Sequence, residues 1–194
     1  MYKNYNTLID HDAKIQKYID FIRLYGPYRF FATLTFQYAL TDDEGIKHAS
    51  EHIKRFLKKL FGRHWQKHGI ACLTGIATLE HASILKQDKD SKRSIKDRGT
   101  CHFHFLLKEH PSLHKDPLTA LRQVTDAWET SARSLNYKIS RKLVSTHGTD
   151  VQLIQTDGIY GYVLKEGKNP VWKYQERLFY LDKEGLLAVD TAVI

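Results

Sequence analysis

Two histidines separated by one residue are the first feature of this 194-residue sequence that could do chemistry. His102 and His104 flank Phe103 in a run, Cys101 to Lys108, that reads as a β-strand. Successive side chains of a strand point to opposite faces, so both imidazoles lie on one face, about 7 Å apart. Imidazole is a common ligand of transition metals, and the pair could therefore hold one metal ion. Two half-buried histidines with ordinary hydrogen bonds are the alternative.

A carboxylate comes within reach of this pair if two neighbouring strands form a hairpin. Residues 70–80 are predicted as the preceding strand, and the polar stretch from Lys86 to Gly99 as an exposed loop. In such a hairpin Glu80 lies opposite or nearly opposite His102, with Cβ atoms about 4.5–5.5 Å apart. His81 competes as a ligand, but alternation places it on the other face. We therefore expect Glu80 to join the two histidines.

One carboxylate and two imidazoles leave coordination positions open for water or phosphate. Mn²⁺ or Mg²⁺ is the divalent cation expected in such a site. Structural zinc would require a site closed by four protein ligands. The two cysteines, Cys72 and Cys101, form no spaced metal motif and suggest no disulfide framework.

A tyrosine followed three residues later by a lysine is the second pattern with chemical meaning. Residues 158–166 are predicted as a short helix, in which Tyr162, Lys165 and Glu166 share one face. A phenol is a poor nucleophile at neutral pH unless a cation or a base assists it, and Lys165 could stabilise the phenolate or a phosphate. Tyr160 is a second candidate nucleophile. A tyrosine packed in the core is the alternative for either residue.

The elements expected around these residues alternate as helix, strand, helix, strand, strand, helix, strand and helix. Thr41 and the pair Asp116-Pro117 carry helix-start signals, and Gly26-Pro27 ends the first helix. This order predicts an α+β fold with a central antiparallel sheet flanked by helices on one or both faces. The strands are expected at residues 28–36, 70–80, 101–108 and 150–155, and the helices from residues 15, 41, 116 and 158.

The composition favours one compact domain with an anionic partner. Hydrophobic residues make up 42%, which is enough for a packed core, and the formal net charge is +8. Nucleic acid is the commonest partner of so basic a protein, although basic proteins without that role exist. The N-terminus lacks the apolar run of a signal peptide, and no stretch is suited to span a membrane, so we expect a reduced, cytoplasmic setting.

Three short motifs together resemble the HUH endonuclease superfamily, and most closely its rolling-circle replication initiators, the Rep proteins of plasmids, phages and small single-stranded DNA viruses. The segment from Phe31 to Phe36 resembles the first motif. His102-Phe103-His104 resembles the metal motif His-hydrophobic-His, and Tyr162-Val163-Leu164-Lys165 resembles the nucleophile motif Tyr-x-x-Lys. The order and spacing of the motifs carry the resemblance, which spans roughly residues 28–167.

The resemblance implies a single HUH domain over residues 1–194, with a ferredoxin- or RRM-like sheet, a core at about 28–167, and an N-terminal helix and C-terminal tail as extensions. It implies that Tyr162 is the nucleophile, that Lys165 assists it, and that His102, His104 and Glu80 hold Mn²⁺ or Mg²⁺. The activity implied is nicking and rejoining of single-stranded DNA or an origin hairpin through a 5′-phosphotyrosine. No helicase motif follows, so a helicase and polymerase of a prokaryotic host are expected partners.

DNA contacts are expected from basic and aromatic residues outside these motifs. Cations of the loop between the hairpin strands would follow the phosphate backbone, as could the basic second helix, for which a solvated face is the alternative. Exposed aromatics near the C-terminus could stack on bases. The residues proposed are Lys86, Lys92, Arg93, Arg98, Trp172, Lys173 and Tyr174.

Three other functions fit the same residues. A single-tyrosine HUH transposase or a relaxase would share the chemistry but act on different DNA. A non-catalytic nucleic-acid-binding domain would use the histidines structurally and form no covalent adduct. A hydrolase with a metal-activated water would tolerate loss of both tyrosines.

Overall fold

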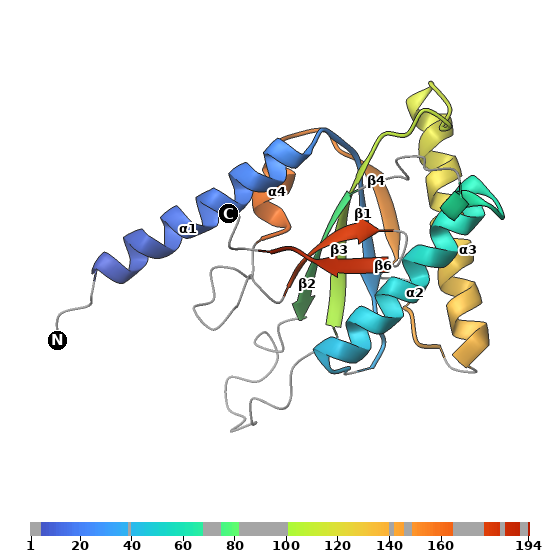
Figure 1. The fold of residues 1–194 in the computed structure, drawn as a ribbon, viewed down its shortest axis with the longest axis horizontal. Helices are drawn as coiled ribbons and strands as arrows, with labels where there is room; N and C mark the ends of the chain where they lie inside the picture. Colours follow the sequence, from blue (N-terminus) through green and yellow to red (C-terminus); the bar gives the residue numbers. More distant parts are fainter. Residues whose placement is uncertain are drawn as a thin grey trace.

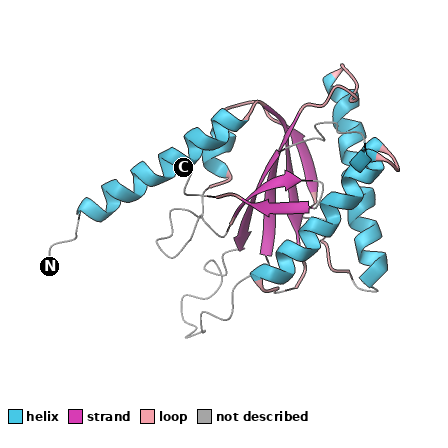
Figure 2. Ribbon diagram, viewed as in Figure 1, coloured by secondary structure: helices cyan, strands magenta, loops and turns pink. Residues whose placement is uncertain are grey.

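The computed structural model describes residues 5–38, 40–67, 75–81, 101–139, 142–145, 149–164, 177–182, 185–190 and 194, with backbone alone for 5–12, 67, 81 and 139. The chain forms an antiparallel sheet with helices on both faces, which confirms the predicted α+β class (Figures 1 and 2). The helices are α1 (Tyr5–Tyr25), α2 (Asp42–Phe61), α3 (Pro117–Ile139) and α4 (Gly158–Tyr162), with a 3-10 turn at Trp65–Lys67. The strands are β1 (Tyr28–Thr35), β2 (Gly75–His81), β3 (Cys101–Lys108), β4 (Asp150–Leu153), β5 (Leu178–Asp182) and β6 (Gly185–Ala188).

The six described strands lie in the order β4-β1-β3-β2-β5-β6, and each pairs antiparallel with its neighbours. β3 is therefore held between β1 and β2. Its register places His102 between Thr35 and Glu80. The hairpin pairing predicted for Glu80 and His102 is confirmed.

Helices α2 and α3 cover one face of the sheet, where the apolar side chains of every strand gather into the larger core. Trp128 of α3 is fully buried there, and its indole Nε1 donates a hydrogen bond to the carbonyl of Thr33 at 2.9 Å. Gly45 lets α2 approach β3 closely, because a Cβ at that position would lie 2.5 Å from the Cys101 sulfur. Burial raises the pKa of the Cys101 thiol to about 12, which keeps the thiol protonated at neutral pH.

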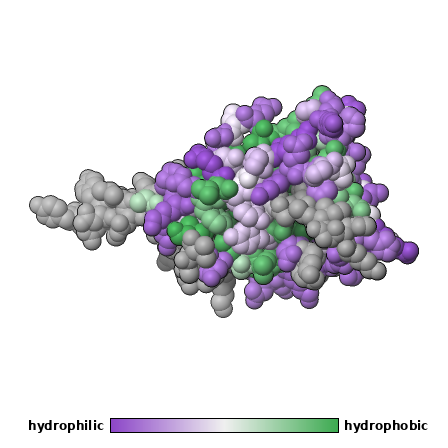
Figure 3. All heavy atoms as spheres, turned by 45° about the horizontal axis from the view of Figure 1, so that its top comes forward, coloured by the Kyte–Doolittle hydropathy of each residue, from purple (hydrophilic) through white to green (hydrophobic). Residues whose placement is uncertain are grey.

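Helices α1 and α4 cover the other face, through a second and smaller apolar cluster. Ile22 of α1 and Val163, just beyond α4, pack there with Phe31, Ile76 and Leu106 of the sheet. In Figure 3 hydrophobic side chains gather near the base of α1, whereas hydrophilic ones dominate the far end of the molecule. The sheet face that carries His102 and His104 is only partly covered, because Thr33, Thr35 and His102 are half-buried rather than buried.

The predicted helix starts are confirmed by their hydrogen bonds. Thr41 and Glu44 form a reciprocal capping box at the start of α2. The Asp116 carboxylate accepts a hydrogen bond from the backbone N–H of Thr119 at 2.8 Å, and Pro117 is the first residue of α3.

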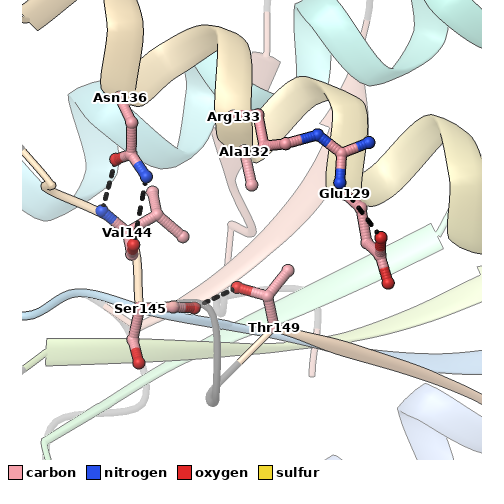
Figure 4. Close-up of a pocket in the computed structure, with 7 residues that line it drawn as sticks. All are labelled: Glu129, Ala132, Arg133, Asn136, Val144, Ser145 and Thr149. Atoms are coloured by element: carbon pink, nitrogen blue, oxygen red, sulfur yellow. Dashed lines mark hydrogen bonds and ion pairs between the residues drawn. The ribbon is translucent and has the colours of Figure 1, made fainter.

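One side chain of α3 ties the segment after the helix back onto it. The Asn136 amide accepts from the backbone N–H of Val144 at 2.7 Å and donates to its carbonyl at 3.2 Å (Figure 4). Val144 in turn bridges to Phe36, beyond the end of β1. The surrounding cavity, of about 170 Å³, contains none of the predicted site residues.

The C-terminal part of the chain differs from the prediction. The strands β5 and β6 are not predicted from the sequence, because both are short and are held in the sheet by pairing, β5 with β2 and β6 with β5, rather than by a local pattern. Arg177 anchors β5, since its guanidinium is bonded to Asp42 at 3.0 Å. α4 ends at Tyr162 rather than at residue 166, and two of its five residues are glycines, which weaken a helix. The start predicted for the second strand, at residues 70–74, lies outside the described residues.

Among the residues that the structure describes, no helix is both long and apolar enough to cross a membrane.

His52 provides a test of the packing between α2 and α3. Its side chain has no exposed surface, and its ring centroid lies 4.3 Å from that of Trp128. Neither ring nitrogen has a hydrogen-bond partner among the described residues. Burial, with a smaller effect of Arg55, lowers the pKa of His52 to about 3, so the folded protein holds this histidine neutral.

We expect His52 to make the fold less stable in acid. In the unfolded chain this histidine has a pKa near 6.5 and is protonated in acid, whereas in the folded protein it stays neutral. His52 therefore lowers the free energy of unfolding by about 1.4 kcal/mol for each pH unit, from about pH 6 down to the folded pKa. His52→Leu should remove this component. Urea denaturation should therefore show the variant gaining stability relative to the wild type between about pH 7 and about pH 5. Exposed His64, changed to Leu, is the control, and a difference that is constant with pH would contradict the interpretation.

Candidate metal centre

Three side chains meet at the middle of the sheet, on the face opposite the larger core. His102 and His104 project from β3, and Glu80 projects from the adjacent end of β2. The Glu80 Oε2 atom lies 3.1 Å from His102 Nε2 and 3.0 Å from His104 Nε2. One donor atom from each residue lies within 4.8 Å of the other two, so the group could hold one metal ion. This is the ligand set predicted from strand alternation and the hairpin.

The separations between Glu80 and the two histidines are compatible with one shared metal ion. Oxygen and nitrogen ligands about 2.1 Å from an ion and at right angles to each other are about 3 Å apart, whereas tetrahedral ligands are farther apart. The two distances from Glu80 match the shorter value. The same distances also suit hydrogen bonds from the two imidazoles, if each carries a proton on Nε2. A metal ion would replace those hydrogen bonds.

The burial of Glu80 favours a bound cation. Its side chain is completely buried, and those of His104 and His102 are 4% and 13% exposed. A carboxylate removed from water needs a compensating positive charge, which a divalent ion or a protonated imidazole supplies. Thr78 adds an orphaned polar atom, because its buried hydroxyl has no hydrogen-bond partner among the described residues. Thr78 lies two residues before Glu80 and opposite His104, so the group's polar surroundings extend along β2.

The structure separates the two candidate tyrosines. The Tyr162 ring centroid lies 5.2 Å from that of His104 and 5.8 Å from that of Phe31, and the residue is 47% exposed. Tyr160 is 8% exposed, and its ring packs on Tyr28 with a centroid distance of 6.1 Å. Tyr162 is therefore beside the histidines and open to a large substrate, whereas Tyr160 belongs to the core.

Phe31 is a site residue whose role was not predicted, although its segment was recognised as a motif. Its ring stacks on His104, with centroids 5.3 Å apart and planes 30° apart, and meets Tyr162 nearly edge-on. Phe31 thus packs against both the imidazole of His104 and the ring of Tyr162. Thr78 is also not predicted from the sequence, since nothing local distinguishes a threonine beside the two histidines and Glu80 from an ordinary strand former.

An open groove of about 630 Å³ begins at Tyr162 and follows the edge of the sheet along β4. Apolar side chains such as Leu118 and Ile159 line it, together with the amides Gln152 and Gln155. Apolar walls with a few hydrogen-bonding groups are typical of a ligand site.

Other predicted site residues lie outside the described residues, so the structure does not bring them to the site or away from it. They are Lys165, Lys86, Lys92, Arg93, Arg98, Trp172, Lys173 and Tyr174.

Comparisons with models of protein families, with curated proteins and with solved structures found no match to this chain.

Metal binding by the three residues can be measured directly. We expect the protein to bind Mn²⁺. Glu80→Gln and His104→Ala should each weaken the affinity by more than about tenfold, because loss of even a residue that only hydrogen-bonds to a metal ligand typically has at least that effect. Isothermal titration calorimetry gives the affinity, and the rise in Tm with Mn²⁺ provides a second readout.

His64→Ala is the matched control, because this histidine is exposed and is not part of the group formed by Glu80, His102 and His104. Unfolding curves recorded in a chelator establish that each variant folds. Equal Mn²⁺ affinities for wild type, Glu80→Gln and His104→Ala would overturn the ligand assignment.

Proposed function

We propose that this chain is a metal-dependent endonuclease of the HUH type, which nicks and rejoins single-stranded DNA as a Rep-like replication initiator. One observation carries the proposal: the half-exposed ring of Tyr162 lies beside the imidazole of His104, within the group formed with Glu80 and His102. A nucleophile next to a divalent-cation site is the arrangement that phosphoryl transfer to tyrosine requires. The motif order in the sequence supports the same function.

Mn²⁺ or Mg²⁺ is the cation that we propose for the site. Two imidazoles and one carboxylate leave room for water and phosphate oxygens, and the distances from Glu80 fit octahedral coordination. When bound, such an ion neutralises charge on the scissile phosphate and polarises it toward attack. Glu80, His102 and His104 are the residues that would hold it.

The chain's own residues would perform the transfer as follows. The phenol of Tyr162 gives its proton to water, its oxygen forms a bond to phosphorus, and the bond from phosphorus to the 3′ oxygen breaks. The 3′ oxygen takes up a proton and leaves as a hydroxyl, and the 5′ phosphate stays on the tyrosine. Because attack must be in line, Phe31 contributes by packing against both the Tyr162 and His104 rings. Lys165 is proposed, from its position in the motif, to offset the developing negative charge.

The substrate proposed is a single strand, such as the nick site of an origin hairpin. Tyr162 stands at the mouth of the groove along β4, whose apolar walls and amide groups suit an unstacked base. A base paired in a duplex could not enter such a groove. The sequence contains no helicase motif, so we propose that a helicase and polymerase of a prokaryotic host unwind and extend the DNA.

A covalent adduct is the test of this function. Protein mixed with labelled single-stranded DNA from beside its gene, in the presence of Mn²⁺, should yield a protein–DNA adduct that resists denaturation on a gel. Tyr162→Phe should reduce adduct formation by at least about 1,000-fold, the scale of losing a nucleophile. The substitution keeps the ring that packs on Phe31 and His104, so the site should stay assembled.

Tyr160→Phe is the matched control, because it removes the same hydroxyl two residues away and should leave the adduct intact. An adduct that survives Tyr162→Phe but not Tyr160→Phe would refute the assignment of the nucleophile. Metal-dependent cleavage that survives loss of both hydroxyls would indicate an activated water instead. Absence of any adduct or cleavage, with DNA still bound, would indicate a non-catalytic nucleic-acid-binding domain.

A further inference from the structure

A second polar groove lies on the opposite side of the sheet from the metal centre. It has a volume of about 660 Å³ and runs between α2 and α3, down to the 3-10 turn that follows α2. Figure 1 shows these two helices side by side, on the face of the sheet away from α4. The groove is therefore separate from the one that begins at Tyr162. Its basic lining residues are Lys54, Arg55, Lys58, Lys59 and Arg63.

The charge of this groove is strongly unbalanced. Among the described residues that line it, five are cationic and only Glu51 is acidic. Glu51 is already bonded to Arg55, at 2.7 Å, and to Lys138, at 3.4 Å. Its carboxylate is thus engaged within the protein, and the wall formed by α2 keeps a positive potential.

The opposite wall supplies neutral hydrogen-bonding groups. Thr130 and Ser134 of α3 line the groove with their hydroxyls, and the Ser134 hydroxyl accepts a hydrogen bond from Arg55 at 2.7 Å, whereas the buried Ser131 hydroxyl donates to the Ala127 carbonyl. Lysine, arginine, serine and threonine side chains are the groups that contact phosphate oxygens of nucleic acids. Cations four residues apart on α2, such as Lys54 and Lys58, are neighbours on the helix surface, with Cβ atoms about 5–6 Å apart. The positive charges therefore form a row along the helix rather than a single cluster. A row suits a chain of phosphates better than a single anion.

We propose that the groove between α2 and α3 binds the sugar–phosphate backbone of a nucleic-acid duplex. The reacting single strand would occupy the face of the sheet that carries Tyr162. The duplex bound in the groove would therefore be the one that flanks this single strand, an assignment that rests on the proposed function. The contacts carry no sequence information, and they would hold the protein on DNA during the reaction.

Duplex binding without metal tests the groove separately from catalysis. The probe is a labelled hairpin of mixed sequence with about two helical turns of duplex, followed by fluorescence anisotropy in a chelator at several salt concentrations. Lys58→Gln with Lys59→Gln should lower the affinity by at least about tenfold at 0.1 M salt, and reduce the slope of log K against log salt by up to about 1.8. Both lysines are exposed, so folding should persist.

Lys115→Gln with Arg122→Gln is the matched control, since it removes the same charge from exposed positions outside the groove. The control should keep the wild-type slope and affinity to within about threefold, the scale of a change in net charge alone. Equal losses in the two double variants, or no loss in either, would overturn the proposal. The Tyr162→Phe variant should lose adduct formation but keep this duplex binding. Failure of the proposed function and failure of the groove to bind duplex are therefore distinguishable.

Discussion

The pairing of β2 with β3 is the constraint on which the rest of the molecule depends. It places Glu80 directly opposite His102, so a carboxylate and two imidazoles meet on one face of the sheet. A slip of one residue would move Glu80 to the other face, among the apolar side chains under α2 and α3. Because β1 holds the second edge of β3 by a ladder that is regular from Phe30 to Thr35, a slip of β3 would have to break that pairing or carry β1 with it.

The two faces of the sheet have different physical tasks. Under α2 and α3 the core is continuous and apolar, and even His52 is buried there in its neutral form. Under α1 and α4 the apolar cluster is smaller and stops at the ring of Phe31, beside the polar group. The large core supplies the stability that allows the other face to carry a buried carboxylate, which by itself costs free energy.

In the proposed function, the division of the sheet would also separate two modes of contact with DNA. The face of Tyr162 offers a half-exposed tyrosine, a compact group that could hold a metal ion, and a groove whose described lining residues are uncharged. The groove between α2 and α3 offers many cations and no chemistry. In the proposed enzyme the first face reacts with one strand and the second supplies affinity, so specificity for the reacting phosphate need not depend on binding strength.

Local patterns in the sequence determined the helix starts, the strand β3 and the common face of His102 and His104, because capping and alternation act between near neighbours. They also led to Glu80, since a hairpin relates residues that are close along the chain. The tertiary structure alone decided that Tyr162 rather than Tyr160 stands beside His104, that Phe31 packs on both rings, and that β5 and β6 extend the sheet. Those outcomes depend on packing between segments far apart in sequence, which no local period encodes.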